Sequence, residues 1–135
     1  MSTKQFEMKK NKTWAVAYLR TAILENGDFS KIQQQKQEVE KYCIENGLSL
    51  KKVFWDVGSG ANFNRKGWND LVEYISSSNG AINFILSTEP SRICRNLPLF
   101  IQETDKLKKG YKLKFKYCQK AKKAISTKNF LFRIK

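Results

Sequence analysis

The stretch TWAVAYL, residues 13–19, decides how the rest of the chain is interpreted. It is a short run of apolar residues with a β-branched and aromatic bias, and it lacks the polar alternation of a half-exposed strand. The run therefore predicts a strand that is buried on both faces. Strands of this kind are typical of parallel sheets that helices cover on both sides.

The next segment along the chain predicts a helix. Residues 31–46 carry their apolar side chains at helical spacing, Ser30 is suited to be the N-cap, and Gly47 is suited to end the helix. The later segments continue the alternation of strand and helix. Strands are expected at 48–55, 81–86 and 111–117, helices at 67–76 and 97–109, irregular connections at 56–64 and 87–96, and a helix end at Gly110.

This order of elements predicts an α/β fold, with a mostly parallel sheet of about four to five strands and helices on both faces. Residues 111–117 alternate aromatic or apolar residues with lysine, which is typical of an edge strand with one wet, basic face. We expect a polar N-terminal tail at 1–12, one domain at 13–117, and a basic C-terminal segment at 118–135.

The positive charge is concentrated near the C-terminus. The net charge is +14, and residues 106–135 contain 12 Lys or Arg residues and no acidic residue. A polyanion is a natural partner for such a segment, because neutralised phosphates release their counterions. A solvated basic tail without a partner is the alternative interpretation.

Cysteine and histidine usage restricts the chemistry. Cys43, Cys94 and Cys118 are far apart, and the chain has no histidine. A zinc site and a disulfide framework are therefore not expected, and the commonest general base is missing. No stretch approaches the roughly 20 apolar residues of a membrane helix. We expect a cytoplasmic protein with free thiols, no metal, no cofactor and no membrane partner.

Arginines follow three of the predicted strands. Arg20 follows the first strand, Arg65 lies in the connection after the second, and Arg92 and Arg95 follow the third. In open α/β sheets, ligands bind at the carboxyl ends of the strands. The planar guanidinium group suits a phosphodiester, so convergence of these side chains would form a phosphate site. Separate surface arginines with local ion pairs are the alternative.

The connection after the second strand begins with Asp56-Val-Gly-Ser59-Gly. Its glycines permit tight turns, and its N–H groups are candidates to line an anion site. It is neither a P-loop nor a dinucleotide-binding fingerprint, so a phosphate-binding role rests on the neighbouring arginines.

Four motifs in this order resemble the catalytic domain of serine site-specific recombinases, the resolvase/invertase family. They are Tyr18-Leu-Arg20, the helix start with Ser30, Gln34 and Lys36, the segment from Asp56-Val-Gly-Ser59-Gly to Asn64-Arg65-Lys-Gly67, and Ser91-Arg92-Ile-Cys-Arg95-Asn96. The resemblance extends from about residue 14 to residue 117.

The resemblance implies a mechanism. These enzymes cut DNA when a serine hydroxyl attacks the phosphodiester and forms a 5′-phosphoserine link, without metal or cofactor. Clustered arginines hold the phosphate and stabilise the transition state. In this chain, Arg20, Arg65, Arg92 and Arg95 would bind the phosphate. Asp56 and Ser59 would orient the network, and Gln34 is a candidate support.

The chain departs from this family in the residue that reacts. The nucleophilic serine aligns with Ala22, whose methyl group cannot attack phosphorus. Thr21 carries a hydroxyl but is one residue away, so on an extended backbone it points in the opposite direction. The aspartate before the family's third-strand arginine is Ser91 here, and Glu89 is a candidate substitute.

The C-terminal part departs as well. Family members continue into a long dimerisation helix and a DNA-reading domain, for which residues 119–135 are too short. These residues suit a helix remnant or a basic segment that lies on DNA. The lysines expected to contact DNA are Lys112, Lys114, Lys116, Lys120, Lys122 and Lys123.

Three functions remain open from the sequence. The first is a recombinase catalytic domain that is degenerate at Ala22. The second is a non-catalytic module that binds DNA or forms a homodimer, a higher oligomer, or a heteromer with an active recombinase. The third is an unrelated small α/β protein that binds a phosphate or nucleotide.

Overall fold

The computed structural model describes residues 13–24 and 26–119. Its elements follow one another in the order β1 (Thr13–Thr21), α2 (Ser30–Asn46), β2 (Leu48–Val57), α3 (Lys66–Ser77), β3 (Phe84–Ser87), α4 (Pro90–Ile93), α5 (Leu97–Tyr111) and β4 (Lys114–Tyr117). This alternation confirms the predicted α/β class.

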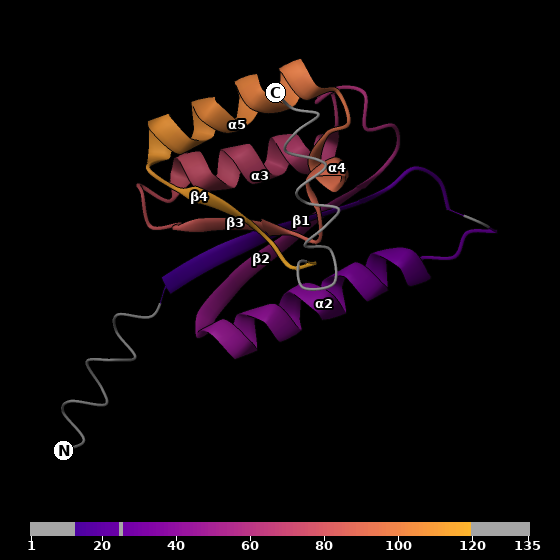
Figure 1. The fold of residues 1–135 in the computed structure, drawn as a ribbon, viewed down its shortest axis with the longest axis horizontal. Helices are drawn as coiled ribbons and strands as arrows, with labels where there is room; N and C mark the ends of the chain where they lie inside the picture. Colours follow the sequence, from indigo (N-terminus) through magenta and orange to yellow (C-terminus); the bar gives the residue numbers. More distant parts are fainter. Residues whose placement is uncertain (1–12, 25, 120–135) are drawn as a thin grey trace.

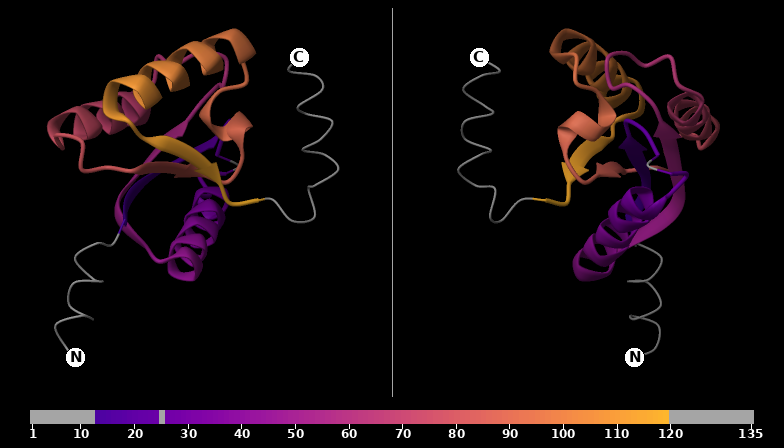
Figure 2. Two further views of the ribbon diagram at one scale, coloured as in Figure 1. Left: turned by 60° about the vertical axis from the view of Figure 1, so that its left-hand side comes forward. Right: turned by 90° about the vertical axis from the view of Figure 1, so that its right-hand side faces the viewer.

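The strands form one parallel sheet in the order β2-β1-β3-β4. Helix α2 covers one face of this sheet, and α3 and α5 cover the other (Figure 1). The two further views show the sheet twisting between these helical layers (Figure 2). Strand β4 lies at an edge, as its alternating pattern predicts. Its lysines are exposed, whereas its aromatic residues are partly buried.

The central strand β1 supplies both halves of the core. Ala17 and Leu19 pack toward α2, whereas Val16 and Tyr18 pack toward α3 and α5. All four are fully buried. Burial on both faces explains the uninterrupted apolar run at 13–19, because successive side chains of a strand point to opposite faces.

Several predicted boundaries are wrong for local reasons. Ser30 is the first residue of α2 and not its side-chain cap, because the Asp28 carboxylate accepts hydrogen bonds from the Ser30 N–H and hydroxyl. Gly110 does not end α5. The helix continues to Tyr111, and Lys112 adopts the left-handed conformation with φ 54°. Gly47 is left-handed, as predicted.

The third strand and the connection after it also differ from prediction. Residues 81–83 are not part of β3, because the Ala81 N–H bonds to Ser78 O in a turn. Pro90 begins a single helical turn, α4, inside the connection expected to be irregular. None of the helices within 13–24 and 26–119 is both long and apolar enough to cross a bilayer.

Strands β1 and β3 pair only at residues 15–17 of β1 and then diverge. Side chains take over the hydrogen bonds that the missing part of β3 would make. The Ser87 hydroxyl donates to Tyr18 O at 2.8 Å, and the Gln35 side chain bonds to the backbone of Arg20. The candidate site lies at the carboxyl ends of the strands, where β1 and β3 no longer pair.

Candidate functional site

The carboxyl ends of β1, β2 and β3 share one edge of the sheet, and the predicted arginines gather there. Arg20 is in register with Asp56 on β2. Arg65 immediately precedes α3, and Arg92 and Arg95 lie in and just after α4. We call this group of four arginines the arginine rim.

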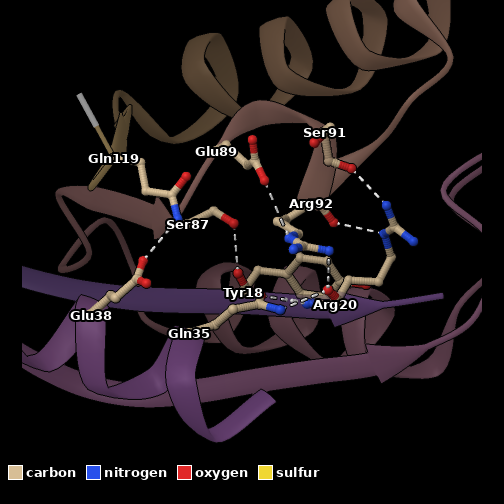
Figure 3. Close-up of polar contacts among 9 residues, drawn as sticks. All are labelled: Tyr18, Arg20, Gln35, Glu38, Ser87, Glu89, Ser91, Arg92 and Gln119. Atoms are coloured by element: carbon tan, nitrogen blue, oxygen red, sulfur yellow. Dashed lines mark hydrogen bonds and ion pairs between the residues drawn. The ribbon is translucent and has the colours of Figure 1, made fainter. Parts of the chain in front are cut away.

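Arg20 is at the centre of the rim. Its side chain is buried, with 1% of the residue exposed. The guanidinium donates to three backbone carbonyls: Nε to Arg92 O at 2.9 Å, one terminal nitrogen to Gly58 O at 2.7 Å, and the other to Ser91 O at 2.7 Å. These carbonyls belong to two different connections, so Arg20 links the loop after β2 to the turn at α4. Figure 3 shows its contacts with Ser91 and Arg92.

Gln35 on α2 holds the backbone of Arg20 from the other side. Its Oε1 accepts from the Arg20 N–H at 3.1 Å, and its Nε2 donates to Arg20 O at 3.0 Å. Gln35 is buried, whereas the predicted support, Gln34, is exposed. The helical stripe of α2 explains the difference, since position 35 is on the same face as Ile32 and Val39.

Arg65 belongs to a second polar group in the rim. Its side chain donates to the Tyr18 hydroxyl at 2.6 Å and to Ile93 O at 2.5 Å. The Tyr18 hydroxyl in turn donates to Asp56 Oδ2 at 2.6 Å. Burial, followed by the hydrogen bond to Asp56, raises the pKa of Tyr18 far above its ordinary value, so the phenol stays neutral.

Asp56 also stabilises the first turn of α3, which starts at Lys66. Its two carboxylate oxygens accept from the N–H groups of Gly67 and Trp68 at 2.8 and 2.9 Å. These contacts satisfy donors that the first turn of the helix leaves unpaired. The predicted orienting role of Asp56 thus takes the form of contacts to Tyr18 and to α3.

Arg92 and Arg95 are the accessible members of the rim. The Arg92 side chain is 27% exposed and forms an ion pair with Glu89 at 3.6 Å. One of its terminal nitrogens donates to Arg20 O at 3.3 Å, while its buried Nε has no hydrogen-bond partner in the described part of the chain. Arg95 is exposed, and its side chain makes no hydrogen bond or ion pair with residues 13–24 and 26–119.

The four positive charges act on one another. Burial chiefly, and then the charges of Arg65, Arg95 and Arg92, lower the pKa of Arg20 below its ordinary value. Such a concentration of positive charge favours an anion. The Arg95 guanidinium and the second terminal nitrogen of Arg92 make no hydrogen bond within the described residues, whereas each nitrogen of Arg20 and Arg65 donates to a protein oxygen.

The structure also describes the residues around Ala22, the position where the resemblance to the family predicts a nucleophile. Ala22 is exposed and directly follows β1. The Thr21 side chain is buried, and its hydroxyl donates to Ile23 O at 3.4 Å. Ser59 is exposed, and its hydroxyl accepts from the Ala61 N–H. Position 22 thus carries only a methyl group, and the neighbouring hydroxyls of Thr21 and Ser59 are engaged in hydrogen bonds within the chain.

The glycine loop contributes carbonyl groups to the rim. Gly58 O accepts from Arg20, and Gly60 O accepts from the Arg95 N–H at 2.6 Å. The N–H of Gly58 is used by Thr21 O. The anion site expected from this loop's N–H groups therefore gains no donor from Gly58.

Of the lysines predicted to contact DNA, Lys112 and Lys114 lie away from the rim. Lys114 is in register with Phe84 at the start of β3, and Lys112 precedes it, so both lie at the amino edge of the sheet. Lys116 is one strand position from the carboxyl end, with its ammonium group 5.1 Å from the centre of the Phe84 ring. Lys120, Lys122 and Lys123 lie outside the described residues.

Sequence reasoning missed Gln35, Ser87 and Gly60. A Cβ on Gly60 would lie 2.6 Å from a terminal nitrogen of Arg20, so only glycine fits there without displacing the guanidinium. The described residues contain no cluster of three potential metal ligands among Cys, Asp and Glu.

Comparison with known proteins gives one family match. A family model described as the resolvase N-terminal domain matches residues 15–135. A sequence comparison with curated proteins finds no significant match.

Solved structures with a similar fold have related descriptions. The N-terminal catalytic domain of TP901-1 integrase has a TM-score of 0.72 at 18% identity, covering 90% of this chain and 91% of that chain. A resolvase family site-specific recombinase from Streptococcus pneumoniae has a TM-score of 0.67 at 19% identity, covering 91% and 87%. The C-terminal catalytic domain of ISC1926 TnpA, an IS607-like serine recombinase, has a TM-score of 0.67 at 20% identity, covering 90% and 80%.

Proposed function

Because this chain belongs to the family of resolvase N-terminal domains, the catalytic domains of serine recombinases, we propose that it binds the DNA backbone at the arginine rim and that Ala22 prevents it from cutting the strand. The family argues against an unrelated nucleotide binder. The observation that carries the proposal is the meeting of the other three arginines around Arg20, two residues before the exposed Ala22.

The rim suits a phosphodiester in charge and in donor geometry. Arg92 and Arg95 offer guanidinium donors at its accessible side, and these form paired hydrogen bonds with phosphate oxygens. Arg20 and Arg65 add positive charge behind them. Of the acidic groups nearby, Asp56 is engaged with Tyr18 and α3, whereas Glu89 pairs with Arg92 inside the rim, so a phosphate would compete with that ion pair.

Cleavage by this family's chemistry needs a hydroxyl at position 22. A serine oxygen there would attack phosphorus, lose its proton, and form a phosphoserine ester while the 3′ oxygen of the broken bond leaves with a proton. The methyl of Ala22 provides no such atom. Thr21 does not replace it, because its hydroxyl is buried and donates to Ile23 O.

Partners of the same family are part of the proposal. A domain that binds DNA without cutting it is suited to pair with a second copy or with an active recombinase, and to act within the cytoplasm. Residues 120–135 carry six Lys or Arg residues and follow Gln119, whose N–H donates to Thr88 O next to the carboxyl end of β3. We propose that Lys120, Lys122 and Lys123 extend the contact with phosphates.

The test compares the natural chain with Ala22→Ser on supercoiled plasmid DNA. We expect both proteins to retard the DNA in a salt-dependent way, and only Ala22→Ser to leave a covalent protein–DNA adduct after denaturation. An adduct with the natural chain would overturn the assigned role of Ala22. Absence of salt-dependent retardation by the natural chain would overturn the DNA-binding function itself.

A further inference from the structure

We infer that Arg20 is a positioning residue: it fixes the loop at 58–60 and the turn at 91–92 around itself, and leaves the phosphate to Arg92 and Arg95. The inference rests on the proposed function, because it assigns separate tasks within the same rim. It is carried by the three carbonyls around the guanidinium and by the glycine packed against it.

Three of the five N–H groups of the Arg20 guanidinium are already occupied, and burial of the side chain shields the other two from solvent. Each of its three nitrogens donates to a carbonyl oxygen at 2.7–2.9 Å, and the side chain is buried. A phosphate that took two of these donors would leave carbonyls of Gly58 and Ser91 without partners. Buried carbonyls without partners are costly, so the carbonyl contacts oppose direct access of a phosphate to Arg20.

The same contacts place the accessible arginines. Arg20 donates to Arg92 O, and Arg92 donates back to Arg20 O, so the two residues hold each other reciprocally. Gly60 is packed against the Arg20 guanidinium, and its carbonyl accepts from the Arg95 N–H at 2.6 Å. Arg20 therefore fixes the backbone positions from which the side chains of Arg92 and Arg95 extend.

Substitution by lysine separates positioning from direct contact. Lysine keeps the positive charge but lacks the fork of donors that reaches three carbonyls. We expect Arg20→Lys to weaken binding of a fluorescent DNA duplex about tenfold or more, as much as Arg20→Gln does, because both lose charge-assisted hydrogen bonds. Arg92→Lys and Arg95→Lys should each weaken binding less than Arg20→Lys does, because lysine loses the paired hydrogen bonds but still contacts phosphate as a point charge.

The salt dependence of DNA binding distinguishes a phosphate contact from a positioning role, because loss of a positioning residue does not change it. Each phosphate contact contributes about 0.9 to the slope of log affinity against log salt. Arg92→Gln and Arg95→Gln should each lower that slope by about this amount. Arg20→Lys should leave it unchanged. A slope reduced in Arg20→Lys as much as in Arg95→Gln, or full affinity of Arg20→Lys, would overturn the inference.

Gly60→Ala tests the inference with every charge in place. Its Cβ would displace the Arg20 guanidinium, so we expect weaker binding with an unchanged salt slope. Tighter binding would show instead that the loop competes with phosphate for Arg20. Gly110→Ala, where the added Cβ has nothing within 4 Å, is the matched control. If the natural chain itself showed no salt-dependent DNA binding, the proposed function would be refuted and not this assignment alone.

Discussion

The Tyr18 hydroxyl donates to Asp56 at 2.6 Å, so the central strand and the start of α3 are joined through one carboxylate. Asp56→Ala removes the acceptor of three donors at once. We expect it to lower the free energy of unfolding by about 2–4 kcal/mol, measured by urea denaturation. Asp70→Asn is the control. It breaks only an exposed ion pair with Lys66 and should change stability by less than about 0.5 kcal/mol.

Gly67 is tightly enclosed, and substitution there should be destabilising. A Cβ would collide with the carbonyl oxygen of Trp55, a backbone atom, and with the Asp56 carboxylate. We expect Gly67→Ala to lower the thermal midpoint, at a cost of about 1–3 kcal/mol or more. Gly110→Ala, on an open part of α5, should raise stability by about 0.5–1 kcal/mol because it removes backbone freedom. Equal effects of the two substitutions would contradict the packing described around Gly67.

Ionisation of Tyr117 makes the free energy of unfolding depend on pH in the alkaline range. Burial raises its pKa well above the ordinary value, whereas the unfolded chain ionises near pH 10. Stability is therefore unaffected by this group below about pH 10 and falls above it, because only the unfolded state releases the proton.

The variant Tyr117→Phe isolates this contribution. Stability of the natural chain should fall more steeply with pH, by about 1.4 kcal/mol per pH unit, than that of the variant between the two pKa values. Denaturant titrations above and below pH 10 measure the difference. Parallel curves for the two proteins would show that Tyr117 ionises normally in the fold.

The two charged edges of the sheet should differ in their effect on DNA binding. Lys114 lies three residues before the end of β4, about 10 Å from the carboxyl edge at about 3.3 Å per residue. At physiological salt the screening length is about 8 Å, so Lys112→Glu with Lys114→Glu should weaken binding less than Arg92→Glu with Arg95→Glu. Binding curves at two salt concentrations distinguish the edges, and a larger loss from the lysine pair would move the contact surface to the amino edge.

The sequence was sufficient for the features that repeat along the chain. The buried run at 13–19 correctly indicated a central strand, and alternating lysines correctly indicated the edge strand β4. The meeting of the arginines was predictable because parallel strands end on the same side. Their separate tasks were not, since burial of Arg20 depends on carbonyls of Gly58 and Ser91, which are 38 and 71 residues away in sequence.

Contacts through the backbone explain the remaining errors. Gln35 and Gln34 are adjacent, and it is Gln35 that shares the buried face of Ile32 and Val39, so the helical stripe and not the family motif indicates which one meets Arg20. Ser87 gave no motif signal, because its role is to replace a strand hydrogen bond where β3 diverges.

Because β1 and β3 stop pairing after Ala17, the end of β1 is held by different contacts from the rest of the strand. Beyond Ala17, a glutamine, a serine and an arginine side chain take the place of a neighbouring strand on that side of β1. The Arg20 amide proton is held there by the Gln35 side chain and not by a neighbouring strand, so local opening can expose it to solvent exchange while the core of the sheet stays closed. The end of β1 that carries Arg20 can thus loosen and tighten without unfolding of the rest of the sheet.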